Sequence, residues 1–178
     1  MARVTSGWQL SCSLLELLGL TMWIGGLAVI LTSVIPATFN SFGIEAGGRF
    51  LRRVFDNYNA LTSGIVILLI GSTWFRLWKS RNSLSGNLPP TRTEVALLVA
   101  LSLVTTLIVL VLGPNAVQLQ EAAFLAEGEV ATKTAYEAFF RTHMIVRALH
   151  LINGGLAVGL LVVKFRQWVG RRGAFGFE

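Results

Sequence analysis

Residues 65–70 of the chain read Ile65-Val66-Ile67-Leu68-Leu69-Ile70, a continuous apolar run in which apolar and polar residues do not alternate. A strand of a membrane barrel alternates apolar and polar residues, so this run predicts a helix instead. It lies inside an apolar stretch from about Ala60 to Trp78, whose only charge is Arg76 near its end. About 20 helical residues cross the roughly 30 Å hydrocarbon core of a bilayer, and this stretch therefore has the length of a transmembrane helix.

Three further stretches of the same kind lie on either side of it. Of the 178 residues, 53% are hydrophobic and only 13% are charged, about half the share that is usual in a soluble domain. The sequence therefore predicts one all-α domain over residues 1–178, an integral membrane four-helix bundle. Its predicted spans cover about 9–35, 58–78, 94–113 and 140–166. The first stretch is too long for a secretory signal peptide, and we expect it to be retained as a helix.

The connections between the spans carry breaking and capping residues. Pro36 is expected to end the first helix, and an outer loop with several glycines follows over residues 43–48. Residues 82–91 form a predicted turn, and Thr91 at its end can cap the third helix. Each of these features separates two spans.

The second half of the chain has two further signals. Gly113 and Pro114 indicate a break or kink, and residues 115–126 form a short outer helix that either extends the third helix or lies outside it. Thr134 and Glu137 have the spacing of a capping box, so the fourth helix is expected to begin near Ala135, outside the membrane.

The basic residues predict the orientation of the bundle. With four spans both termini lie on one side, which carries nine basic residues: Arg3, Arg76, Lys79, Arg81, Arg92, Lys164, Arg166, Arg171 and Arg172. The other side carries five: Arg49, Arg52, Arg53, Lys133 and Arg141. Cytoplasmic loops carry the excess of Lys and Arg, so both termini are expected in the cytoplasm. This explains the net charge of +6 without a nucleic-acid partner.

Polar residues recur on one face of the predicted fourth helix. His143, Arg147, His150 and Gly154 follow one another at spacings of four, three and four residues, and Asn153 lies alongside them. Asp56, at the outer start of the second helix, is the expected partner of Arg147. Two interpretations remain open: a polar outer cavity that binds a ligand, metal or cofactor, and an Asp56–Arg147 ion pair that fixes helix packing.

Glu16 is the one charged residue of the first span. It could carry a proton or bind a cation, and it could equally accept a hydrogen bond from a Ser or Thr of a neighbouring helix. Small residues recur in the first and fourth spans, and the Gly155-x-x-x-Gly159 motif is typical of close helix contact.

The sequence contains no pattern of a known catalytic site. A single cysteine, Cys12, excludes an internal disulfide, and neither a phosphate-binding loop nor a nucleophile–base arrangement is present. We therefore expect no enzymatic activity. His143 and His150 lie on one helix and cannot clamp a haem from both faces, although either could supply one axial ligand to a haem or chlorin. Copper usually requires more soft ligands than three Met and one Cys, so the metal, if any, stays open.

The first helix and its continuation resemble a known family. Met22-Trp23-Ile24-Gly25-Gly26, followed by Pro36 and Phe39, is similar to the start of the transmembrane protein 205-like family, a bacterial membrane family with a domain of unknown function. His143 with Asn153 is similar to the pattern of that family's fourth helix. The Trp-x-Gly-Gly motif also resembles copper-resistance D membrane domains. The resemblance implies a four-helix bundle and no established reaction. The pattern positions are Trp23, Gly25, Gly26, Pro36, Phe39, His143 and Asn153.

Three functions are compatible with these features. The first is a non-enzymatic protein of the inner (plasma) membrane, a scaffold or accessory subunit that contacts lipid and other membrane protein subunits. The second is a small transporter or copper-handling protein that uses Glu16 and the histidines. The third is a subunit that binds haem or chlorin through one histidine.

Overall fold

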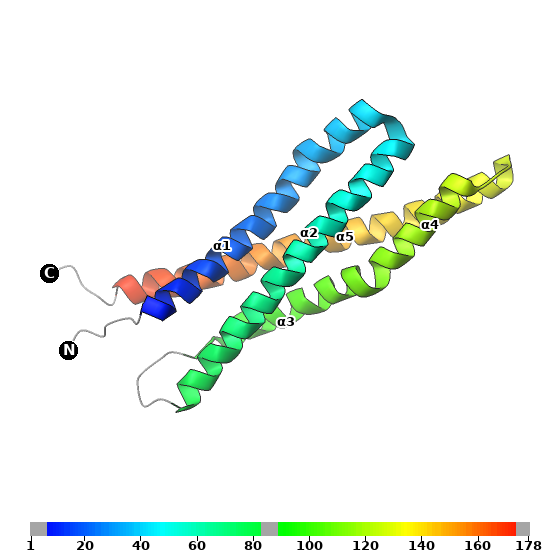
Figure 1. Cartoon of the computed structure of the whole chain (residues 1–178). Helices are drawn as coiled ribbons and strands as arrows, with labels where there is room; N and C mark the ends of the chain where they lie inside the picture. The colour runs from blue at the N-terminus through cyan, green and yellow to red at the C-terminus, as the bar shows by residue number, and fades with distance from the viewer. Residues whose placement is uncertain (1–6, 83–88, 174–178) are drawn as a thin grey trace.

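The computed structural model describes residues 7–82 and 89–173, which are helical almost throughout and contain no strand (Figure 1). The elements are α1 (Gly7–Val29), η1 (Ile30–Val34), α2 (Ile35–Asn82), α3 (Arg92–Thr106), η2 (Leu107–Leu112), α4 (Gly113–Leu125) and α5 (Glu129–Gly173), where η denotes a π-helical segment. Within the described part, three helical stretches are long and apolar enough to cross a membrane: Ser11–Arg81, Arg92–Leu125 and Glu129–Gly170. The all-α prediction is confirmed.

The first of these stretches folds back on itself at one residue. Gly43, inside α2, has a φ of 71° and a ψ of −170°, while its neighbours are helical. A side chain disfavours this conformation, and glycine adopts it readily. Figure 1 shows that the chain reverses direction here and forms two long arms. The predicted loop over residues 43–48 is therefore wrong in extent, because a single glycine makes the turn.

Both mid-helix prolines follow a π-helical segment. The N–H of Ile35 donates to the carbonyl of Ile30, and the N–H of Gly113 donates to the carbonyl of Ile108, in each case five residues back. Pro36 and Pro114 come next in the chain. A proline ring clashes with the carbonyl four residues before it, and the wider π turn accommodates this clash within a continuous helix.

This geometry changes two predictions. The helix does not end near Pro36, because it continues into α2. The break at Gly113 and Pro114 is a π segment, beyond which the helix continues as α4. The short outer helix is therefore the extension of α3 and η2.

Helix α5 begins earlier than the capping box indicates. It starts at Glu129, after Gly128 with a φ of 90°, and its 45 residues span about 67 Å. The hydroxyl of Thr134 donates to the carbonyl of Val130 at 3.0 Å, as in a helix interior. The predicted start near Ala135 is thus wrong. The cap of α3 is confirmed, since the Thr91 hydroxyl accepts a hydrogen bond from the N–H of Glu94 at 3.3 Å.

The arms pack in a ring in which α1 contacts α2, α2 contacts α3, α3 contacts α5 and α5 contacts α1. The start of α1 and the end of α5 lie at one end of the bundle, together with the end of α2 and the start of α3 (Figure 1). We call this end the terminal end, and the opposite end, with Gly43 and Gly128, the hairpin end. Arg3 and residues 83–88 of the predicted turn lie outside the described residues.

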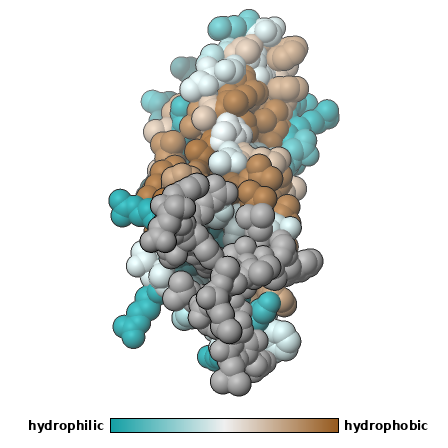
Figure 2. All heavy atoms as spheres, turned by 90° about the vertical axis from the view of Figure 1, so that its left-hand side faces the viewer, coloured by the Kyte–Doolittle hydropathy of each residue, from teal (hydrophilic) through white to brown (hydrophobic). Residues whose placement is uncertain are grey.

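The outer surface of the helices is largely apolar. Figure 2, which faces the terminal end, shows hydrophobic residues across the middle of the molecule and hydrophilic residues at its top and edges. Large exposed side chains include Leu18, Ile67, Leu103 and Leu110, which are 58–71% exposed. An apolar band on the outside of a helical bundle is what contact with lipid requires.

Candidate functional site

Each arm of the ring presents one seam of buried residues to the interior. The residues of these four seams are Glu16, Leu20, Trp23, Leu27 and Ile30 on α1 and η1; Tyr58, Thr62, Ile65 and Leu69 on α2; Glu94, Leu98, Leu101, Thr105 and Ile108 on α3 and η2; and His150, Asn153, Ala157, Leu160 and Lys164 on α5. Alternating spacings of three and four residues place each set on one helix face, as in a left-handed bundle.

Every seam has a charged residue at its terminal end. Glu16 begins the seam of α1 and Glu94 begins that of α3, while Lys164 ends the seam of α5. Arg76 follows Leu69 by seven residues, two helical turns farther along α2. Because the four arms meet at this end, the two carboxylates and two cations come together inside the bundle. We call these four residues the charge network.

Lys164 occupies the centre of the charge network. Its Nζ donates to Oε2 of Glu16 at 2.7 Å and to Oε1 of Glu94 at 2.8 Å. The Lys164 side chain is 4% exposed, and those of Glu16 and Glu94 are 5% and 0% exposed. One ammonium group therefore joins α1, α3 and α5 away from solvent.

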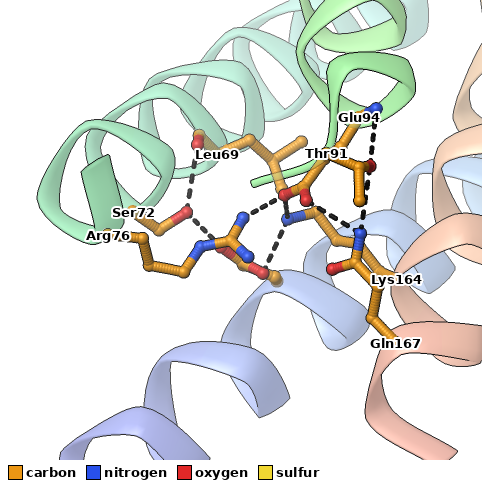
Figure 3. Close-up of polar contacts among 8 residues, drawn as sticks. Leu69, Ser72, Arg76, Thr91, Glu94, Lys164 and Gln167 are labelled. Atoms are coloured by element: carbon orange, nitrogen blue, oxygen red, sulfur yellow. Dashed lines mark hydrogen bonds and ion pairs between the residues drawn. The ribbon is translucent and has the colours of Figure 1, made fainter. Parts of the chain in front are cut away.

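Arg76 completes the charge balance from α2. Its Nη2 donates to Oε1 of Glu94 and lies 3.7 Å from Oε1 of Glu16. Figure 3 shows the Arg76 and Lys164 side chains reaching Glu94 from different helices. With two positive and two negative groups the network has no formal net charge. Paired charges of this kind avoid most of the cost of burying a lone ion.

Polar neighbours occupy much of the remaining hydrogen-bonding capacity of the carboxylates. The hydroxyl of Ser72 donates to Oε1 of Glu16. The Nε2 of Gln167 donates to Oε2 of Glu94 at 3.0 Å and to the Thr91 hydroxyl at 3.3 Å (Figure 3). The capping residue of α3 thus also belongs to the outer shell of the network.

A small cavity of about 10 Å³ opens beside the charge network. Its lining residues are Ser13, Glu16, Leu17, Arg76, Lys164, Gln167 and Trp168. This volume is about that needed for the centre of one water molecule. The buried Nε of Arg76 has no hydrogen-bond partner among the described residues.

The predicted polar stripe lies toward the hairpin end, and its members have different environments. His150 is 7% exposed and packs against aromatic rings, with centroid distances of 5.4 Å to Phe55 and 6.0 Å to Tyr58. His143 is half-buried beside Phe139, at 5.5 Å between ring centroids. The stripe therefore points one histidine into the core and leaves the other near its edge.

Asn153 belongs to the interior as well. Its Nδ2 donates to the hydroxyl of Thr105 on α3 at 2.9 Å, while its Oδ1 is buried without a donor among the described residues. Nearby on α2, Tyr58 donates its hydroxyl proton to the carbonyl of Trp23 at 3.1 Å. These two bonds join α5 to α3 and α2 to α1, so they contribute to helix packing.

The structure does not form the expected pair between Asp56 and Arg147. Both residues are exposed, and no ion pair between described residues joins them. The ion-pair interpretation of the stripe is therefore wrong. For Glu16, a hydroxyl donor from a neighbouring helix is confirmed in Ser72, together with a lysine that the sequence interpretation did not place there.

No group of three or more His, Cys, Asp or Glu side chains suited to a metal occurs in the part of the chain that the structure describes. The other pattern positions serve packing or face outward. Trp23 is 1% exposed, and Gly26 lets the ring of Tyr58 approach to 3.3 Å from where a Cβ would lie. Gly25 and Pro36 are exposed, and Phe39 is 41% exposed.

In the sequence, residues 91–94, from Thr91 to Glu94, predict a helix cap, and Arg76 and Lys164 are among the basic residues that predict the orientation. The missed signal is the spacing on the fourth span. Lys164 continues the three-and-four repeat of Asn153, Ala157 and Leu160, which places its side chain in the interior.

A family model described as "Domain of unknown function (DUF4149)" matches residues 18–124, more than half of the chain. This match includes Arg76 and Glu94 and leaves out Glu16 and Lys164. No curated protein and no solved structure matches the chain.

Proposed function

We propose that this chain, which belongs to the DUF4149 family, is a non-enzymatic membrane protein that crosses the membrane four times. Its proposed role is that of a scaffold or accessory subunit of a larger membrane complex. The observation that carries this proposal is the charge network. Its two carboxylates and two cations bind one another and join all four arms. Ionisable groups used in this way fix the relative positions of helices, which is what a subunit needs in order to present a constant outer face.

The outer face of α1 supports a protein partner. Thr21, Gly25, Ala28 and Thr32 are all exposed and follow one another at spacings of four, three and four residues. A Cβ added to Gly25 would meet no atom within 4 Å, so this glycine is not needed for packing inside the bundle. Small residues on a membrane helix allow another helix to approach closely.

We place the terminal end in the cytoplasm of a bacterial-type inner membrane. Of the nine basic residues assigned to that side, Arg76 and Lys164 are paired in the charge network, which leaves seven. Of the five on the other side, Arg49 and Arg52 pair with Glu45 and Glu121, which leaves three. The excess stays on the same side after these pairs are removed.

Co-purification tests the proposal. The full-length tagged chain is extracted from native membranes in mild detergent, and its partners are compared with those of the Gly25→Leu variant. We expect a membrane protein to be retained by the wild type and lost from Gly25→Leu. The control is Gly64→Leu on α2, where an added Cβ also meets no atom within 4 Å. Recovery of the wild type without any partner would contradict the proposal.

A transporter is the second candidate, and the observation that favours it is the cavity beside Glu16. A buried carboxylate next to a water-sized space can exchange protons. In reconstituted vesicles this function requires proton movement that Glu16→Gln abolishes. Equal proton movement with the two proteins, or none with either, would exclude Glu16 as a carrier.

A further inference from the structure

A groove of about 330 Å³ runs along the outer surface between α1 and α2, close to the terminal end. Its lining residues are Cys12, Leu15, Leu68, Gly71, Ser72 and Phe75. The walls are mostly apolar, and Gly71 leaves the groove open because a Cβ at this position would meet no atom within 4 Å. The groove therefore has the shape and polarity to receive a flexible hydrocarbon chain.

Aromatic and basic residues on α2 indicate where the groove lies relative to the membrane surface. Trp74 and Trp78 are 72% and 57% exposed, as expected of residues at the interface between hydrocarbon and headgroups. Lys79 lies four residues after Phe75, so it is on the same face of α2, one turn beyond the groove. It lies about 12 Å along the helix from Gly71.

Lys79 provides a charge that the groove itself lacks. No ion pair between described residues includes it, although Arg76 one turn earlier is paired with Glu94. An ammonium group at headgroup depth attracts the negative charge of an anionic lipid. The apolar groove beneath it would then take the acyl chain of that same lipid.

We infer that this groove is a binding site for one anionic phospholipid, with its phosphate at Lys79 and an acyl chain along Gly71. The inference is independent of the proposed scaffold function, because a lipid site needs no protein partner. A neutral lipid can fill the groove with its chain and lacks the excess negative charge that Lys79 attracts, so the site discriminates by headgroup.

Native mass spectrometry of the full-length protein with added phosphatidylglycerol or phosphatidylcholine tests this site. The wild type is expected to retain one phosphatidylglycerol at activation energies that strip phosphatidylcholine. Gly71→Leu fills the groove and is expected to lose that lipid. The matched control is Gly64→Leu, two turns earlier on α2, where an added Cβ also meets no atom within 4 Å. It is expected to retain the lipid.

The charge is tested separately. Lys79→Gln is expected to reduce the preference for phosphatidylglycerol over phosphatidylcholine several-fold. Lys133→Gln, at an exposed position of α5 near the hairpin end, should leave this preference unchanged. Equal lipid retention by Gly71→Leu and Gly64→Leu would overturn the site. A wild-type dimer that Gly71→Leu converts to a monomer would overturn it too, because a second copy would then occupy the groove.

Cys12 gives a readout that does not depend on these variants folding. It is the single cysteine of the chain, and it lines the groove. In detergent, phosphatidylglycerol is expected to slow its alkylation by N-ethylmaleimide several-fold, and phosphatidylcholine much less. The same rate with both lipids would contradict a headgroup-selective site.

Discussion

Replacement of Lys164 by methionine is the sharpest perturbation of the charge network. The change keeps the length of the side chain and removes its charge, so Glu16 and Glu94 lose the donor that lies 2.7 and 2.8 Å from them. Arg76 then faces two carboxylates, and the network has a net charge of −1. Removal of one partner from a buried ion pair typically costs about 3–5 kcal/mol. We expect a loss of that size, a roughly 150- to 4,500-fold fall in the folding equilibrium constant.

A second substitution distinguishes loss of charge balance from loss of packing. Glu16→Gln together with Lys164→Met removes one charge of each sign and leaves Arg76 paired with Glu94. The Ser72 hydroxyl still has an oxygen at position 16 to which it can donate. We therefore expect the double variant to recover about 2 kcal/mol relative to Lys164→Met alone, a coupling within the range of contacting residues.

Reversible unfolding by SDS in mixed micelles, followed by far-UV circular dichroism, measures these free energies. The matched control is Lys133→Met, an exposed lysine of α5 for which we expect no measurable loss. A loss below about 1 kcal/mol for Lys164→Met, the value typical of an exposed ion pair, would refute the reasoning. The reasoning would also be refuted if the loss in the double variant equalled the sum of the losses in Glu16→Gln and Lys164→Met.

Three further predictions concern packing and helix ends, measured by the same unfolding assay. Tyr58→Phe removes the hydrogen bond to the carbonyl of Trp23 and is expected to cost about 1 kcal/mol; no loss would mean that this bond is not formed. Gly26→Val is expected to destabilise by about 1–3 kcal/mol, because even a Cβ would lie 3.3 Å from the Tyr58 ring. Gly128→Ala should cost about 1 kcal/mol at its φ of 90°, whereas Thr134→Ala should cost less. The reverse order for the last two would restore the capping box as the start of α5.

The sequence was informative about element type and weaker on how the helices are joined. Apolar runs such as residues 65–70 predicted long helices because their composition alone decides that outcome. The prolines were misleading, since a proline forbids one hydrogen bond and the chain met this constraint with a π turn at residues 30–34. The sequence could not predict which of the nearby glycines makes the turn, because nothing in the local sequence distinguishes Gly43, the one with positive φ.

The candidate site followed a different pattern. Glu16 was recognised as unusual because a charge inside an apolar span is costly. Glu94 and Lys164, two other members of the charge network, lie 78 and 148 residues away in the chain, and each has an ordinary local interpretation as part of a cap or as a topological charge. Only the spacing of the buried residues along each helix shows that these side chains meet. For Lys164 this could have been predicted, because it follows Leu160 by four residues and so lies on the same buried face.

The contact between Lys164 and the two carboxylates is tested most directly by solid-state NMR of the chain in lipid bilayers. The chain has three lysines, so ¹⁵N labelling of lysine side chains gives three Nζ signals, and Lys164→Arg identifies one of them. We expect that signal to show strong dipolar contacts with the ¹³C-labelled carboxylate carbons of both Glu16 and Glu94. A Lys164 signal without a short-range contact to either carboxylate would contradict the charge network and the bundle that it closes.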